Sequence, residues 1–170
     1  MNRCVLAVVF FSAAISWQAM AANDQADDAK YLNRVESAVF ETTGDHQSVA
    51  KHGATCIAQI IKPGVVNAPT IISSDFDSGV IVANNNFKFV WHGFLGTAIE
   101  DTGRTTLTFE AKDGRFRIVH TSIEQFITYP GQYAALNQGW TPVPAETIGA
   151  DMKKALDDIS LKIADCVKAP

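Results

Sequence analysis

Charged residues are scarce in this sequence. They make up 19% of its 170 residues, and 18 acidic residues outnumber 14 basic ones, so the formal net charge is −4. The lack of a basic excess argues against a generic binder of nucleic acid or of anionic membranes. Cysteine is scarce as well, because three residues are too few for a scaffold held by several disulfides. Internal repeats and interdomain linkers are also missing, and the length suits one domain.

Long apolar runs are missing after the first 21 residues, so the rest of the chain offers no segment that could span a bilayer. The N-terminal segment has Arg3, then an apolar stretch over 5–17, then small residues in an A-x-A pattern at 19–21. This order is typical of a secretory signal peptide. We therefore expect residues 1–21 to be cleaved and the protein to be periplasmic or secreted, without a stable membrane span. A membrane anchor is the alternative, but no basic cluster follows the apolar stretch.

The mature N-terminus is acidic and rich in small residues, so residues 22–34 are predicted to form a tail. A single α+β domain is expected over residues 35–168. Strands are predicted at 37–43, 70–74, 80–83 and 87–91, with Asn84-Asn85-Asn86 ending the third of them.

Two helices are predicted from apolar residues spaced three and four apart. The first is capped by Asp45 and ends at Pro63-Gly64, and its small residues, Gly53 among them, would allow a close approach to a sheet. The second begins near Ala145.

The clearest local signal is Asp113-Gly114, a two-residue turn between two alternating runs. This hairpin fixes the register, so that Glu110 faces Arg117 on a polar face and Leu107 faces His120 on an apolar one. A sheet that is apolar on one face must be covered on that face only. The fold predicted is therefore α+β, an antiparallel sheet of about five strands with two helices on one face, in the order β-α-β-β-β-β-α.

Removal of the signal segment would leave two cysteines, Cys56 and Cys166. Cys56 lies on the apolar stripe of the first predicted helix and Cys166 on that of the last. If both helices cover the same face, the two side chains point into one layer. In an oxidising compartment this predicts a disulfide. Two buried free thiols are the alternative.

Two hairpin segments carry a family resemblance. They are 73–82, which includes Asp75-Phe76-Asp77-Ser78-Gly79, and 106–118, centred on Lys112-Asp113-Gly114-Arg115. Both resemble hairpins of an uncharacterised bacterial domain family described as having a TATA-binding-protein-like (TBP-like) fold. The resemblance implies that fold and, because exported members occur at the cell envelope, an envelope location. It implies no activity.

Motifs for catalysis are missing. The sequence has no H-E-x-x-H, Cys-x-x-Cys or G-x-S-x-G, so no catalytic residue, metal site or cofactor is predicted. Asp75-x-Asp77-x-Gly79 lacks the later ligands of a calcium loop and is interpreted as an ordinary turn. A small metal-dependent or hydrolytic enzyme built around His92 or His120 is the alternative hypothesis.

Aromatic residues gather in one long connection, which contains Tyr129, Tyr133 and Trp140. Long loops are often functional, and rigid aromatic side chains provide contact area. These three residues are the candidate binding site, and a lid packed on the end of the sheet is the alternative. We expect a non-catalytic binding or scaffold module. Its partner would be an envelope protein or a small ligand, not nucleic acid, bound at this loop or at the exposed sheet face.

Overall fold

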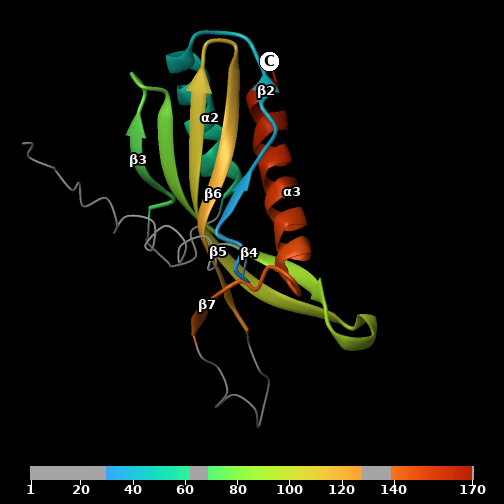
Figure 1. The fold of residues 1–170 in the computed structure, drawn as a ribbon. Helices are drawn as coiled ribbons and strands as arrows, with labels where there is room; N and C mark the ends of the chain where they lie inside the picture. The colour runs from blue at the N-terminus through green and yellow to red at the C-terminus, as the bar shows by residue number, and fades with distance from the viewer. Residues whose placement is uncertain (1–29, 62–68, 128–138, 170) are drawn as a thin grey trace, which may run out of the picture.

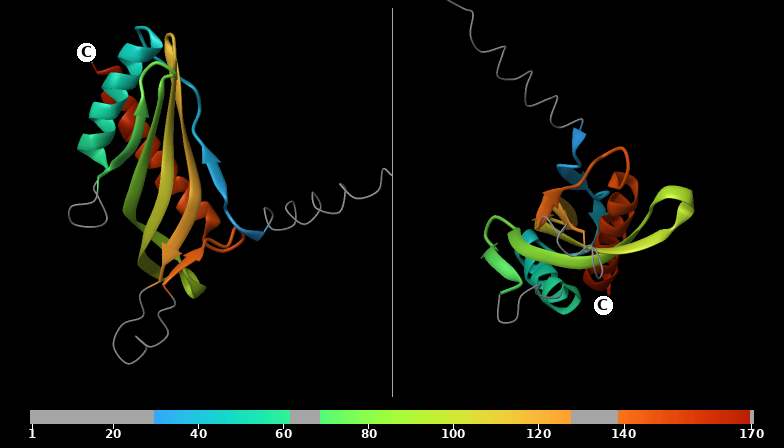
Figure 2. Two further views of the ribbon diagram at one scale, coloured as in Figure 1. Left: turned by 90° about the vertical axis from the view of Figure 1, so that its left-hand side faces the viewer. Right: turned by 90° about the horizontal axis from the view of Figure 1, so that it is seen from below.

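The computed structural model describes residues 30–61, 69–127 and 139–169. Over these ranges seven antiparallel strands form one sheet, and two α-helices lie against one of its faces (Figures 1 and 2). The strands are β1 (Arg34–Glu36), β2 (Phe40–Glu41), β3 (Ile71–Asp75), β4 (Val80–His92), β5 (Ala98–Lys112), β6 (Arg115–Phe126) and β7 (Trp140–Pro142). The helices are α2 (His46–Ile60) and α3 (Gly149–Lys168). The predicted fold class is confirmed, whereas the predicted signal peptide lies outside the described residues.

The β5–β6 hairpin forms the centre of the sheet, whose strand order is β1-β6-β5-β4-β3, with β2 and β7 also paired to β6. Its register is the predicted one: Glu110 faces Arg117 and Leu107 faces His120. The ladder shifts between Arg104 and Thr106, where Ser122 on β6 takes a φ of 50°. This bulge adds one residue to β6, after which the two strands remain paired as far as Phe126.

The prediction that Asn84-Asn85-Asn86 ends a strand is wrong. β4 runs without interruption from Val80 to His92, paired with β5 along its whole length. Asn85 is 1% exposed, and its side-chain amide donates to Thr105 Oγ1 at 3.4 Å. A cross-strand partner therefore outweighs the low intrinsic strand preference of asparagine.

The first predicted strand, 37–43, is a strand only at Phe40–Glu41 (β2), and β1 (Arg34–Glu36) precedes it; both pair with β6, with a break from Ser37 to Val39 between them. The division falls at Ser37, whose N–H donates to the Ile118 carbonyl while its hydroxyl accepts from the Ile118 N–H at 2.9 Å. The sheet also starts earlier than predicted. Arg34 belongs to β1, and Leu32 donates its N–H to the Val143 carbonyl, so the end of the predicted tail is part of the fold.

Helix α2 begins after Asp45, as predicted, and the Asp45 carboxylate accepts from the Ser48 N–H at 2.7 Å. Gly53 faces the sheet so closely that a Cβ there would lie 2.6 Å from the Phe109 ring. The prediction that small residues allow a close approach is therefore confirmed. Only a glycine leaves room for Phe109 in the core below this helix.

Helix α3 begins at Gly149, not at Ala145 as predicted. The preceding residues form turns, in which Ile148 and Gly149 both donate their N–H groups to the Pro144 carbonyl. The apolar stripe packs on the sheet through Met152, Leu156 and Ile163, each 0% exposed. None of the described helices is long and apolar enough to cross a membrane.

The two helices are joined by the Cys56–Cys166 disulfide, which confirms the predicted pair. The Cα atoms are 5.8 Å apart, within the range that such a bond requires. Cys56 is 0% exposed and belongs to the main core cluster between helices and sheet. A disulfide of this kind is typical of proteins that fold in an oxidising compartment.

Candidate binding surface

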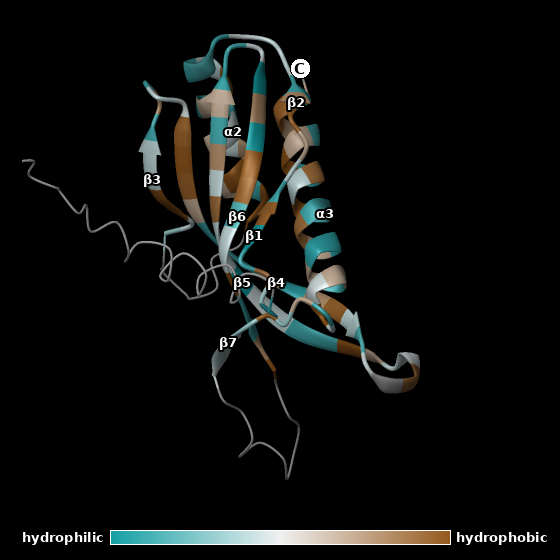
Figure 3. Cartoon of the chain, in the orientation of Figure 1, coloured by the Kyte–Doolittle hydropathy of each residue, from teal (hydrophilic) through white to brown (hydrophobic). Residues whose placement is uncertain are grey.

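The face of the sheet that points away from the helices is here called the open face. Alternation along the strands places Thr106 and Thr108 of β5 and Thr121 of β6 on it, whereas Leu107 and Phe109 point to the helices. Hydrophilic and hydrophobic residues accordingly alternate along β5 and β6 in Figure 3. The sequence predicted this division from the hairpin alone.

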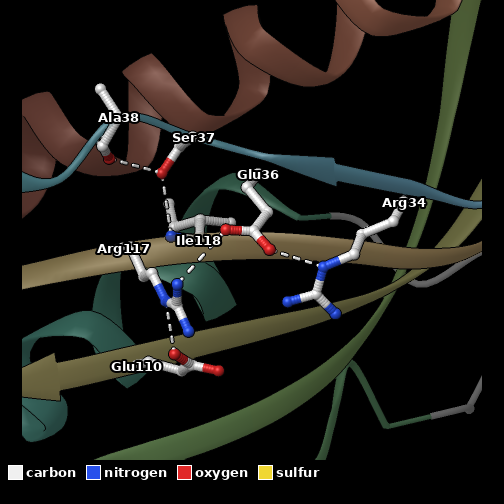
Figure 4. Close-up of polar contacts among 7 residues, drawn as sticks. All are labelled: Arg34, Glu36, Ser37, Ala38, Glu110, Arg117 and Ile118. Atoms are coloured by element: carbon white, nitrogen blue, oxygen red, sulfur yellow. Dashed lines mark hydrogen bonds and ion pairs between the residues drawn. The ribbon is translucent and has the colours of Figure 1, made fainter.

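Four charged side chains form a chain across the open face (Figure 4). Arg34 Nε lies 2.6 Å from Glu36, Arg117 Nη1 lies 3.3 Å from Glu36, and Arg117 Nε lies 2.6 Å from Glu110. The hydrogen bond from Arg34 lowers the pKa of Glu36, and the hydrogen bond to Glu110 raises the pKa of Arg117. The predicted Glu110–Arg117 pair is thus present as part of a longer chain in which opposite charges balance.

A shallow hollow of about 230 Å³ lies beside this chain, next to the β5–β6 turn. Its lining combines charged and apolar side chains: Val39, Glu110, Lys112, Arg115, Phe116 and Arg117. Val39 is 55% exposed, so an apolar contact is available at the rim.

Trp140, a predicted binding residue, lies at the other end of the open face. It is in β7, opposite Phe126, and the two rings are 5.6 Å apart at an angle of 66°. The Arg104 guanidinium lies 4.4 Å from the centre of the Trp140 ring and also contacts Glu124 at 2.5 Å. Trp140 is therefore held in place by a cation–π contact and an edge-on ring contact.

The two candidate surfaces of the sequence, the exposed sheet face and the aromatic connection, thus meet at Trp140. The other predicted binding residues, Tyr129 and Tyr133, lie outside the described residues. The sequence did not identify Arg104 as a site residue, because its segment resembles an insertion between two strands. The hairpin register, extended past Thr106, places Arg104 opposite Glu124 only if the extra residue of the bulge is counted.

His120, one centre of the alternative enzyme hypothesis, is enclosed in the core at 0% exposure. Its Nε2 lies 3.0 Å from Ser160 Oγ, and its Nδ1 lies 3.3 Å from Thr105 Oγ1. Burial lowers the pKa of His120 to about 4, although the negative charge of Asp157 acts in the opposite direction. A serine beside a neutral histidine resembles a nucleophile and base, but Ser160 is only 2% exposed, so no substrate reaches the pair in this conformation.

His92, the other centre of that hypothesis, is at the surface near the start of α3. Its backbone N–H donates to the Asp151 carboxylate at 3.0 Å, and its ring Nδ1 lies 3.3 Å from the same oxygen. The first of these bonds is the main reason that the pKa of Asp151 is lowered. Within the described ranges no three histidine, cysteine or acidic side chains are grouped to hold a metal ion.

The segment Asp75-x-Asp77-x-Gly79 is a turn, in which Asp75 accepts from the N–H groups of Asp77 and Ser78. His46, at the start of α2, links this turn to the Asp113-Gly114 turn. Its Nε2 lies 3.0 Å from the Asp77 carbonyl, and its Nδ1 lies 2.9 Å from the Asp113 carboxylate. The bond to Asp113 raises the pKa of His46. These polar contacts hold a helix against two turns.

Comparison with solved structures shows where this fold occurs. The chain is similar to a TBP-like protein from Parabacteroides distasonis, with a TM-score of 0.57 and 8% identity, over 79% of this chain and 91% of that one. It is also similar to a DUF4468 family protein from Bacteroides ovatus, with a TM-score of 0.55 and 12% identity, over 84% of this chain and 89% of that one.

The fold of this chain is TBP-like. The resemblance seen in the two hairpins is thereby confirmed as a likeness to an uncharacterised TBP-like domain family. No family model and no curated protein matches the sequence. At such low identity the likeness concerns the fold and transfers no activity.

Proposed function

We propose that the mature protein is a non-catalytic binding module of the cell envelope, and that it binds an envelope protein or a small ligand through the open face. The observation that carries this proposal is the one-sided covering of the sheet. Both helices lie on one face, while the other presents hydroxyl groups, paired charges and the fixed ring of Trp140.

Export is part of the proposal. It is supported by the signal-like pattern of residues 1–21 and by the Cys56–Cys166 disulfide, which would be stable in the periplasm or outside the cell. We further propose that residues 35–168 form one domain.

The electrostatics of the open face favour a neutral or mixed-charge partner. Arg117 and Arg104 are each bound to a carboxylate, so neither offers a full positive charge to a phosphate. A nucleic acid is therefore a poor match. The enclosure of His120 supports a role without catalysis, because a general base must reach its substrate.

The test places a bulky charge at the centre of the open face. Thr108 lies there, between Val82 of β4 and Val119 of β6. We expect Thr108→Arg to reduce at least tenfold the retention of the mature protein on immobilised envelope proteins. The matched control is Leu161→Arg, on the exposed side of α3, where the native side chain is 50% exposed.

Circular dichroism must show both variants folded. Equal retention of Thr108→Arg and wild type, or loss of retention in Leu161→Arg alone, would contradict the proposed surface.

A further inference from the structure

A second surface lies at the edge of the sheet, where β4 continues beyond its neighbour β3. The β3–β4 ladder ends at the pair Ile71–Ala83, followed by a bond from the Asn84 N–H to the Thr70 carbonyl at 2.8 Å. β4 continues to His92. From Asn85 onward it has β5 on one side and, among the residues that the structure describes, no strand on the other.

Four hydrogen bonds show which backbone groups of β4 point to this edge. The Gly79 carbonyl and the Gly93 N–H bond to Ala111 and Thr97 on the β5 side, so odd-numbered residues face β5. The Asn84 N–H bonds to β3, and the His92 N–H bonds to Asp151, so even-numbered residues face outward. Between these two, Asn86, Lys88 and Val90 direct their N–H and C=O groups to the open edge.

A groove runs along this edge, between β4 and α3. It consists of two hollows of about 590 and 330 Å³ that share Lys88, Ala155 and Asp158 as lining residues. The larger hollow has an apolar wall made of Ile60, Ile61, Phe87, Ala155 and Ile159. Proteins bind extended peptides at a strand edge through two features, backbone groups that are free to pair and a neighbouring pocket for a side chain. Among the described residues, this edge has both.

The charges that line the groove balance: Lys88, Lys154 and Lys162 are positive, and Glu100, Asp151 and Asp158 are negative. Lys88 is bound to Glu100 at 2.5 Å. Asp151 accepts the His92 N–H and remains negative, and the positive charge of Lys154 contributes to the lowering of its pKa. A peptide without a strong net charge therefore suits this groove.

We propose that this β4 edge binds an extended peptide segment of a partner protein by β-strand addition. The peptide backbone pairs with Asn86, Lys88 and Val90, and one apolar side chain enters the larger hollow. Alternating donors and acceptors along an edge are matched by another extended chain, not by a compact small molecule. This surface lies at the edge of the sheet, and the proposal for it does not depend on the function proposed for the open face.

The first test is hydrogen exchange on the free mature protein. We expect the amides of Asn86, Lys88 and Val90 to exchange at least a hundredfold faster than those of Phe87 and Phe89, which bond to β5. Equal protection of both sets would mean that the edge is already covered, and would overturn the proposal.

The second test uses a display library of random ten-residue peptides as the probe. We expect selected peptides to contain an apolar residue, to protect the three edge amides and to bind Lys88→Pro at least tenfold more weakly than wild type. Proline removes the outward N–H without touching the β5 ladder. Lys88→Ala removes the same ammonium group but keeps the N–H, so the selected peptides should also bind Lys88→Pro more weakly than Lys88→Ala.

Several results would contradict strand addition: no enriched peptide, equal binding to Lys88→Pro and wild type, or protection confined to open-face amides. If Lys88→Pro does not fold, peptide binding to Val90→Pro and the amide protection in the wild type take its place as the test of strand addition. A dimeric mass of the free protein, with the same amides protected, would assign the edge to a second copy and overturn the peptide proposal.

Discussion

The side chain of His120 shows how a polar residue can be held in the core. It belongs to a buried chain that passes from Asn85 through Thr105 and His120 to Ser160, linking β4, β5, β6 and α3. A neutral imidazole has one donor and one acceptor nitrogen, which suits two hydroxyl neighbours. A protonated ring would place a positive charge in the core, away from water, and for this reason burial lowers the pKa of His120 to about 4.

This burial predicts a pH dependence of stability. Well above pH 6.5 the His120 ring is neutral in both the folded and the unfolded protein, so it adds no pH dependence to the free energy of unfolding. As the pH falls from about 6.5 to 4, the unfolded chain takes up a proton that the folded one excludes, so the free energy of unfolding should fall by about 3 kcal/mol. Urea unfolding at pH 7.0 and 4.0 measures the change.

The matched variant is His120→Gln, which can keep a hydrogen bond but does not titrate. It should lose this part of the pH dependence, and comparison with the wild type cancels the contribution of His46, whose raised pKa acts with the opposite sign. A His120 ring that titrates near pH 6.5 in the folded protein by NMR would contradict the account.

At the scale of elements, helix α2 is fixed at both of its ends. Asp45 caps its first turn, and the two contacts of His46 hold this start against the hairpin turns. The Cys56–Cys166 disulfide holds its third turn against α3. The helix–helix layer therefore depends on a covalent bond that closes a long loop.

Removal of this bond should destabilise the protein strongly. Closure of a loop with a sequence separation of 110 residues predicts about 4–5 kcal/mol from chain entropy, as an upper figure. We expect the Cys56→Ala/Cys166→Ala variant to lose about 2–5 kcal/mol in urea unfolding. Mass spectrometry of the protein isolated from cells, unfolded and alkylated without reductant, should find neither Cys56 nor Cys166 modified. Modification of both would show that the bond does not form in the cell.

The sequence was informative where local chemistry decides the structure. Asp113-Gly114 set the hairpin register, and Asp45 and the apolar spacing set α2. The disulfide could be predicted as well, because two amphipathic helices on one face direct Cys56 and Cys166 into the same layer.

The errors occurred where tertiary partners outweigh local preference. Asn85 continues a strand because Thr105 accepts its amide, and Ser37 interrupts one because its hydroxyl takes the place of a main-chain acceptor. The bulge at Ser122 has no signal in the sequence, and without it Arg104 could not be placed beside Trp140. The sequence therefore predicted some residues of the candidate surface, but it did not predict that Trp140 and the exposed sheet face lie on the same side of the sheet.

At the scale of the whole molecule, the described part is asymmetric. One side carries both helices (Figure 2), the disulfide and the main core cluster, while the other is the open face, on which Arg34, Glu36, Glu110 and Arg117 pair with one another. Stability thus depends on the helical side. The open face can bind a partner without a loss of core contacts, which is the arrangement expected of a binding module on a rigid scaffold.

The most direct test of that claim is photocrosslinking in living cells. A benzoylphenylalanine residue is introduced into the exported protein at Thr106, in the middle of the open face, or at Leu161, on the exposed side of α3. The account predicts a discrete crosslinked product from position 106 and none from position 161. A product from position 161 alone, or none from either position, would contradict binding through the open face.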